Sequence, residues 1–161
     1  SSAASDVYQR QVPLIVFWPG KVPAGSVSHA LHQSTDFFPT FADMLDWELP
    51  DNVRFDGISM KPVLEKNKSY RDDIFCHFPH KIPSTSLRVG DWKLIRWWYD
   101  HPDRSHRYEL FNLAEDEGEA NNLAQQEPKR VKKLSKRMDV LLRESEAVIP
   151  VPNPNYKGED Q

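Results

Sequence analysis

The sequence has 161 residues and a formal net charge of −3 at pH 7, which argues against a nucleic-acid partner held by bulk positive charge. This length allows one domain, or a small domain together with a piece of another. The single cysteine, Cys76, excludes an intrachain disulfide framework and a cysteine-rich zinc site. No stretch reaches the roughly 18 apolar residues that a membrane-spanning helix needs, and no signal-peptide pattern is recognisable. We therefore expect neither nucleic-acid binding nor a membrane span.

The first apolar element follows residues 1–11, which we interpret as a disordered lead-in or a segment added by cloning. Val12–Trp18 (VPLIVFW) is an uninterrupted apolar run that ends at Pro19-Gly20. Continuous apolarity without alternation is typical of a strand buried on both faces of a parallel sheet. A single strand of this kind cannot bury itself, which is a first indication that the chain is part of a larger protein.

A helix is expected at Asp36–Asp46, with Asp36 as its N-cap and Pro39 in its first turn, where the missing N–H costs little. Its apolar stripe comprises Phe37, Phe38, Phe41, Met44 and Leu45. Asp56-Gly57 predicts a turn, and a short helix is expected at Met60–Leu64. The polar segment Asn67–Asp73 is the best candidate for a boundary between two parts of the chain.

Four strands are predicted next. Ile74–Phe78 is stopped by Pro79, and Gly90-Asp91 predicts a tight hairpin turn before Trp92–Tyr99. The third and fourth strands flank a turn-rich segment, residues 100–107. In the middle strand Trp92, Leu94, Arg96 and Trp98 share one face, and the alternate residues share the other. Both faces carry large apolar groups, so packing on both is expected; core packing is favoured over a carbohydrate-stacking surface.

A long amphipathic helix is predicted at Glu127–Val148, with Pro128 at its start. Its apolar stripe should cover one face of the sheet: Val131, Leu134, Met138, Leu141 and Leu142. The opposite side is basic; it could bind an acidic partner, but a solvated face is favoured. The proline-rich tail Ile149–Tyr156 should run extended along a surface.

Few residues indicate chemistry directly. His29 and His32 are interpreted as structural or surface histidines, because no HExxH pattern surrounds them. His77, His80 and Lys81 crowd hydrogen-bond donors where a strand meets a loop, so a binding role and a structural role are about equally favoured. Cys76 lies in the middle of a strand and is expected to be a small buried hydrophobe rather than a nucleophile. The residues alone therefore predict an α/β piece with a small antiparallel sheet and a helix, without a catalytic constellation.

Five segments together resemble the C-terminal third of the sulfatases, of the alkaline-phosphatase-like superfamily. They occur in the family's order and are VPLIVFWPGKVPAGS (12–26), STDFFPTFADML (34–45), FDGISMKPVL (55–64), LRVGDWKLI (87–95) and YELFNLAEDEGEANNLA (108–124). HFPHK (77–81) and VPNPNY (151–156) are similar to segments of sulfatases that act on sulfated glycans.

The resemblance implies a fold and a division of the chain. The fold class is α+β: the C-terminal edge of an α/β sulfatase domain plus a small antiparallel sheet of about four strands on one long C-terminal helix. Residues 12–70 would belong to the large α/β domain, and residues 71–161 would form the C-terminal subdomain. The rest of the catalytic domain would cover the second sheet face, and His77, His80 and Lys81 would contact a sulfated carbohydrate substrate.

The resemblance also implies cofactors that this chain does not carry itself. Sulfatases use calcium and a formylglycine made from Cys or Ser in a C/S-x-P/A-x-R motif. In CHFPH (76–80) the proline is one place too late and no arginine follows, so no metal or catalytic residue is assigned. The chain would then be inactive by itself and would self-associate through its exposed apolar strand and helix. The parent enzyme would work in periplasmic, secreted or lysosomal spaces.

Two alternatives stay open. The chain could be part of a related phosphonate or phosphodiester hydrolase, or a stand-alone module that binds an anionic glycan or a protein.

Overall fold

The computed structural model describes residues 12–152, and these divide into two compact units between Ile74 and Phe75. The division falls just beyond the polar segment predicted as a boundary. The assignment of residues 12–70 to a larger α/β domain stays a prediction, as does any role of residues 1–11 and 153–156, which lie outside the described residues.

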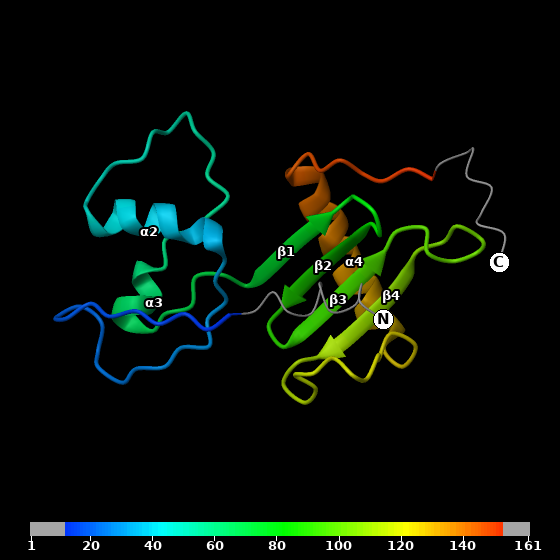
Figure 1. Ribbon diagram of the computed structural model, residues 1–161, viewed down its shortest axis with the longest axis horizontal. Coiled ribbons are helices and arrows are strands. Elements are labelled where there is room, and N and C mark those ends of the chain that lie inside the picture. Colours follow the sequence, from blue (N-terminus) through cyan, green and yellow to red (C-terminus); the bar gives the residue numbers. More distant parts are fainter. Residues whose placement is uncertain (1–11, 153–161) are drawn as a thin grey trace. The chain divides into compact units, whose positions relative to one another are not determined.

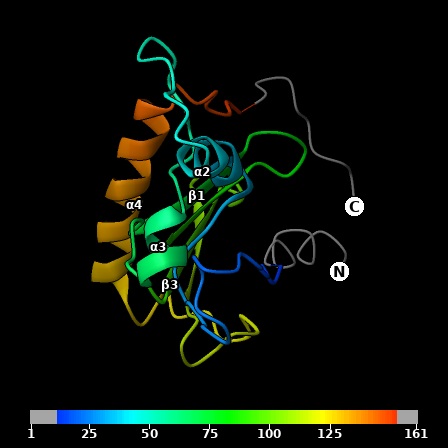
Figure 2. The same ribbon diagram turned by 90° about the vertical axis from the view of Figure 1, so that its left-hand side faces the viewer.

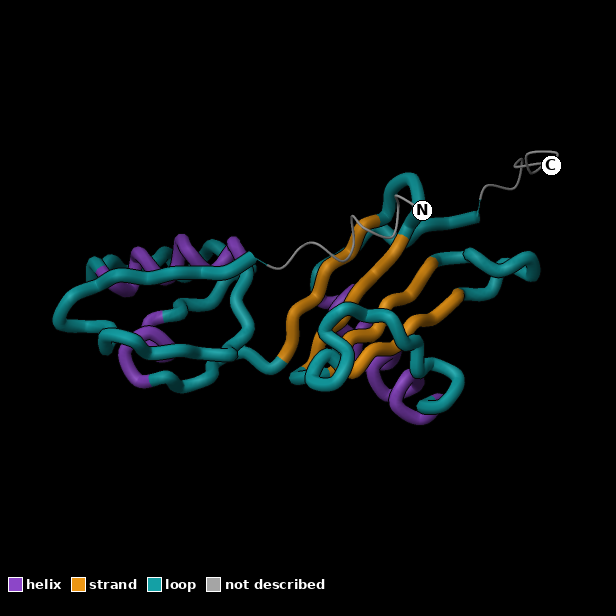
Figure 3. Tube along the Cα trace, turned by 60° about the horizontal axis from the view of Figure 1, so that its bottom comes forward, coloured by secondary structure: helices purple, strands orange, loops and turns teal. Residues whose placement is uncertain are grey.

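The second unit is built on a four-stranded sheet in the order β1-β2-β3-β4 (Figures 1 and 3). Strands β2 and β3 pair antiparallel, as do β3 and β4. Gly90 turns the chain between β2 and β3 with a φ of 56°, a left-handed conformation that glycine adopts at little cost. The predicted hairpin is therefore confirmed. The strands are β1 (Asp73–Phe78), β2 (Ser84–Val89), β3 (Trp92–Trp97) and β4 (Arg107–Asn112).

Helix α4 (Pro128–Glu144) lies along one face of this sheet, as predicted (Figure 2). It ends four residues earlier than expected: the amides of Glu146 and Ala147 bond back to Arg143 and Leu142, and Glu146 takes a positive φ of 51°. Burial of each large apolar side chain stabilises the packing by roughly 1.5–3 kcal/mol. The buried core between sheet and helix comprises Leu87, Leu94, Trp98, Leu110, Leu134, Met138 and Leu142.

The other face of β3 is also buried within this chain. Ile95 is fully buried, and the ammonium of Lys93 lies 2.6 Å from Glu119 of the loop after β4. The expected alternation of faces stops before Tyr99, whose φ of 55° ends the extended backbone and places its ring against the same core as Trp98. The predicted aromatic strand is therefore part of the core.

The first unit holds a 3-10 turn η1 (Ser34–Asp36), helix α2 (Phe37–Met44) and helix α3 (Lys61–Lys66), connected by loops. Both helices were expected, and each differs from its predicted bounds by one or two residues. The amide of Trp47 bonds back to Ala42, and Asp46 takes a positive φ of 50°, which ends the turn after α2. No helix within residues 12–152 is long and apolar enough to cross a bilayer.

The apolar run Val12–Trp18 is exposed in this chain, as expected for a strand whose sheet lies in a larger domain, and its place in that sheet stays a prediction. The run forms no regular strand, and Ile15 and Phe17 are 90% and 89% exposed. A strand needs a neighbour to pair its backbone groups, and residues 12–152 provide none for this run. The stripe of α2 is exposed as well: Phe38 and Phe41 keep about half of their surface in solvent.

Candidate functional site

The loop between β1 and β2 carries two of the three residues predicted to bind substrate. His80 and Lys81 are both exposed, and Lys81 adopts a left-handed φ of 54°. The His80 ring packs edge-on against Phe78, with ring centroids 5.9 Å apart. The loop thus presents an imidazole and an ammonium group to solvent side by side in the sequence.

His77, the third predicted residue, is held inside the chain by both ring nitrogens. Its Nδ1 lies 2.8 Å from the Thr85 hydroxyl, and its Nε2 lies 2.9 Å from the carbonyl oxygen of Val148. The indole N–H of Trp98 donates to the same hydroxyl at 2.7 Å. The Thr85 hydroxyl therefore donates to Nδ1, and the Nε2–H of His77 donates to Val148. His77 attaches the segment after α4 to the sheet.

A buried carboxylate in the first unit was interpreted from the sequence only as a helix cap. Asp36 is completely buried and forms an ion pair with Arg71. Its oxygens also accept the amides of Gln33 at 2.8 Å and Ile58 at 3.0 Å, and the hydroxyl of Tyr70 at 3.0 Å. Asp36 therefore joins three segments of this unit.

His32 extends this network. Its Nδ1 lies 2.9 Å from the Tyr70 hydroxyl, which supports the structural interpretation of this histidine. Burial lowers the pKa of His32 below 6.5, opposed by the charge of Asp36. Burial and the hydrogen bond to Asp36 raise the pKa of Tyr70 to about 12. Both groups are therefore uncharged at neutral pH, and the Asp36–Arg71 pair carries the only full charges of this four-residue set.

The described residues do not fit the cofactors that the resemblance implies. Within residues 12–152, no group of three or more His, Cys, Asp or Glu side chains could hold a metal ion. Cys76 lies half-buried in β1 and lacks the sequence context of a formylglycine precursor. No catalytic step is therefore assigned to this chain.

The family model described as "N-sulphoglucosamine sulphohydrolase, C-terminal" matches residues 7–147. The chain belongs to this family. The match includes both units and the whole of α4, and it confirms the resemblance to sulfatases that the five segments indicated.

Curated relatives of this chain are named as sulfatases. An N-acetylglucosamine-6-O-sulfatase of Bacteroides thetaiotaomicron is 30% identical over 125 residues, which are 71% of this chain and 21% of the relative. A sulfatase of Formosa agariphila is 34% identical over 131 residues, which are 73% of this chain and 23% of the relative. The chain thus spans less than a quarter of the length of these two proteins.

A solved structure supports the fold. A protein in complex with its substrate D-glucosamine-2-N,6-O-disulfate superimposes with a TM-score of 0.66 at 27% identity, covering 80% of this chain and 27% of that chain. The predicted fold class is confirmed: a four-stranded antiparallel sheet with a C-terminal helix matches the C-terminal part of sulfatase structures.

Proposed function

We propose that this chain is the C-terminal part of a sulfatase, a hydrolase of sulfate esters that acts on a sulfated glycan. The family match over residues 7–147 carries this proposal. It is supported by relatives named for 6-O-sulfates of N-acetylated amino sugars and by the likeness to a structure that holds a disulfated glucosamine.

The chemistry would come from the remainder of the parent enzyme. Membership of a sulfatase family leads us to expect calcium and a formylglycine there. In this chain CHFPH departs from the formylglycine motif, and no cluster among residues 12–152 suits a metal. This chain would dock with the rest of the catalytic domain and shape the substrate cleft. By itself it would be inactive.

Within this proposal His80 and Lys81 bind the anionic sugar. Both are exposed, and both can donate to sulfate oxygens, with Lys81 adding a full positive charge. His77, also proposed as substrate-facing, has its ring nitrogens engaged with Thr85 and Val148. It would therefore act on the substrate mainly by holding the end of β1, from which the loop projects.

The activity is tested by incubating the full-length natural protein with glucosamine 6-O-sulfate and measuring released sulfate by ion chromatography. Sulfate release by that protein, and none by residues 1–161 alone with added calcium, is the expected result. Faster cleavage of a phosphonate monoester than of any sulfated sugar would overturn the sulfatase assignment. Calcium-stimulated turnover by residues 1–161 would show that the chemistry is wrongly assigned to the remainder of the parent enzyme.

The binding role is tested by replacing His80 and Lys81 with alanine in the full-length protein. Loss of two donors to the anionic group should raise KM for a sulfated sugar at least tenfold, with a smaller change in kcat. The matched control is the double variant His29→Ala/Lys68→Ala, which removes the same residue types from exposed positions of the other unit. Equal kinetics for the two double variants would remove His80 and Lys81 from the site.

A further inference from the structure

Helix α4 concentrates positive charge in a chain that is negative overall. Its 17 residues include seven Lys or Arg and two Asp or Glu, whereas the whole chain has a formal charge of −3. We define the basic stripe as the cationic residues that lie on the side of α4 opposite the core: Lys129, Lys132, Lys133, Lys136 and Arg143.

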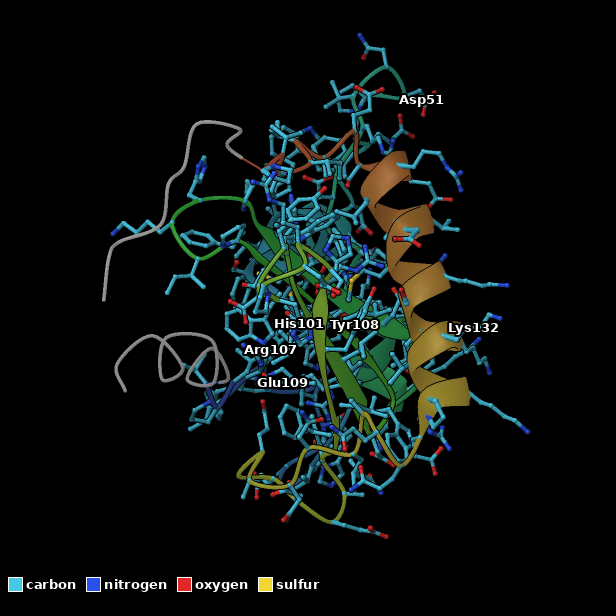
Figure 4. All side chains as sticks on the ribbon, turned by 90° about the vertical axis from the view of Figure 1, so that its right-hand side faces the viewer. Asp51, His101, Arg107, Tyr108, Glu109 and Lys132 are labelled. Atoms are coloured by element: carbon cyan, nitrogen blue, oxygen red, sulfur yellow. The ribbon has the colours of Figure 1, made fainter. Side chains whose placement is uncertain are left out.

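The stripe follows from helical geometry. At about 100° per residue these five positions fall within a sector of roughly 100°, and the stripe is about 21 Å long at a rise of about 1.5 Å per residue. All five side chains are exposed, and Figure 4 shows Lys132 extending away from the sheet. Leu134, Met138 and Leu142 take the opposite side, where they are buried.

The arrangement of the four lysines of the stripe is unfavourable for the helix itself. Lys129 and Lys133 are spaced i,i+4, as are Lys132 and Lys136, and like charges at this spacing repel each other on a helix surface. The first turn contains Lys129 and Arg130 but no acidic residue, although the positive end of the helix dipole favours acids there. A face selected only for solubility and helix stability would interleave acidic residues, so this pattern indicates another requirement.

Two nearby acids pair with residues outside the stripe. Asp139 lies 2.7 Å from Arg96 of β3, and Glu127 lies 3.5 Å from Arg130, which stacks over Trp92. Among the described residues, the structure gives no ion pair for the four lysines of the stripe. Their charge is therefore available to a partner.

We propose that the basic stripe binds a sulfated polysaccharide chain along helix α4. This inference rests on the proposed function, which makes sulfated glycans the anions that the parent protein meets. A row of cations about 21 Å long matches an extended polyanion better than a single sugar. An anionic membrane is disfavoured, because an interfacial helix inserts an apolar face and the apolar face of α4 is already buried against the sheet.

The test measures binding of the full-length natural protein to heparin, as a probe sulfated polysaccharide, by titration in 0.15 M salt. The variant is Lys132→Gln/Lys133→Gln/Lys136→Gln, which preserves helix propensity. The matched control is Lys21→Gln/Lys66→Gln/Lys68→Gln, which changes the net charge equally at exposed positions outside α4. We expect the stripe variant to bind heparin at least tenfold more weakly than wild type, and its affinity to depend less on salt concentration. The affinity of the control variant should stay within twofold of wild type.

Three outcomes would overturn the proposal: equal affinities of the two variants, wild-type binding to DNA as tight as to heparin, or wild-type binding to anionic vesicles as tight as to heparin. Circular dichroism of each variant verifies that α4 is intact. Sulfate release from a sulfated monosaccharide is measured in parallel. If the wild-type protein releases no sulfate but binds heparin through the stripe, the proposed function alone is refuted. If it releases sulfate but the stripe variant binds heparin as tightly as wild type, this inference alone is refuted.

Discussion

His77 and Val148 are 71 positions apart in the sequence, yet Nε2 of His77 lies 2.9 Å from the carbonyl oxygen of Val148. The bond depends on Thr85, whose hydroxyl contacts Nδ1 of the same ring and accepts the indole N–H of Trp98. Strand β2 thereby sets the orientation of a side chain on β1, and that side chain holds the segment that follows α4.

Thr85→Val should release this segment while conserving side-chain volume. The valine leaves the buried N–H of Trp98 without its acceptor, at a cost of about 1–3 kcal/mol, and no longer fixes the His77 tautomer. The amide of Ala147, which donates to the carbonyl oxygen of Leu142, should exchange faster in hydrogen-exchange mass spectrometry. Thr35→Val, at an exposed position, is the control; identical exchange in the two variants would show that Thr85 does not act through His77.

Asp36→Asn should strongly destabilise the first unit. The change leaves the guanidinium of Arg71 buried without its counter-charge, and breaking a buried ion pair in this way costs about 3–5 kcal/mol. Hydrogen exchange should accelerate in the segments that Asp36 joins, residues 33–45 and 56–66.

The control for Asp36 is Asp46→Asn. The Asp46 side chain is 95% exposed, and asparagine tolerates its left-handed backbone, so a change within about 0.5 kcal/mol is expected. If both variants exchange alike, Asp36 is not the centre of this unit.

Gly57→Ala should disrupt the same unit for a steric reason. A Cβ at position 57 would lie 1.9 Å from the carbonyl oxygen of Thr35, so the two backbone segments would have to separate. Forced overpacking costs about 1–3 kcal/mol, and it would also weaken the bond from Ile58 to Asp36. Gly118→Ala, where a Cβ meets nothing within 4 Å, should leave thermal unfolding unchanged. A stable Gly57→Ala variant would mean that the contact with Thr35 is not required.

Local sequence signals predicted much of the four-stranded sheet and of helix α4, whereas the hydrogen-bond network around the buried Asp36 could not be predicted. Gly90 and the alternation of Trp92–Trp97 specify a hairpin within ten residues, and the stripe of α4 identifies its buried side without knowledge of the partner. The partners of Asp36 lie 22, 34 and 35 positions away at Ile58, Tyr70 and Arg71, and no local pattern links them. The sequence could show only that Asp36 lies just before a helix.

Val12–Trp18 shows a second limit of sequence reasoning. Composition indicates that a segment can be buried, but burial needs a partner surface, and residues 12–152 do not form one around this run. The sequence placed His77 in a donor-rich rim that faces the substrate, and this role stays a prediction. It could not show that both ring nitrogens bond within the chain, because Val148 is brought there by the whole length of α4.

Acidification should destabilise the second unit through His106, which lies between Trp98 and Tyr99 with ring centroids 4.9 and 4.8 Å away. Burial, and then the charge of Arg96, lower the pKa of His106 below 6.5, while Asp139 opposes the shift. Below pH 6.5 the unfolded chain therefore binds more protons at this residue than the folded chain, so the free energy of unfolding falls as pH falls. Protonation at Nδ1 would also abolish its acceptance of the Tyr99 amide at 3.2 Å.

His106→Asn keeps an acceptor but does not titrate, and it should lose less stability than wild type between pH 7.5 and 5.5 in urea unfolding followed by tryptophan fluorescence. His29→Asn, at an exposed position of the other unit, should retain the wild-type loss; an equal loss in both variants would assign the acid sensitivity to other groups.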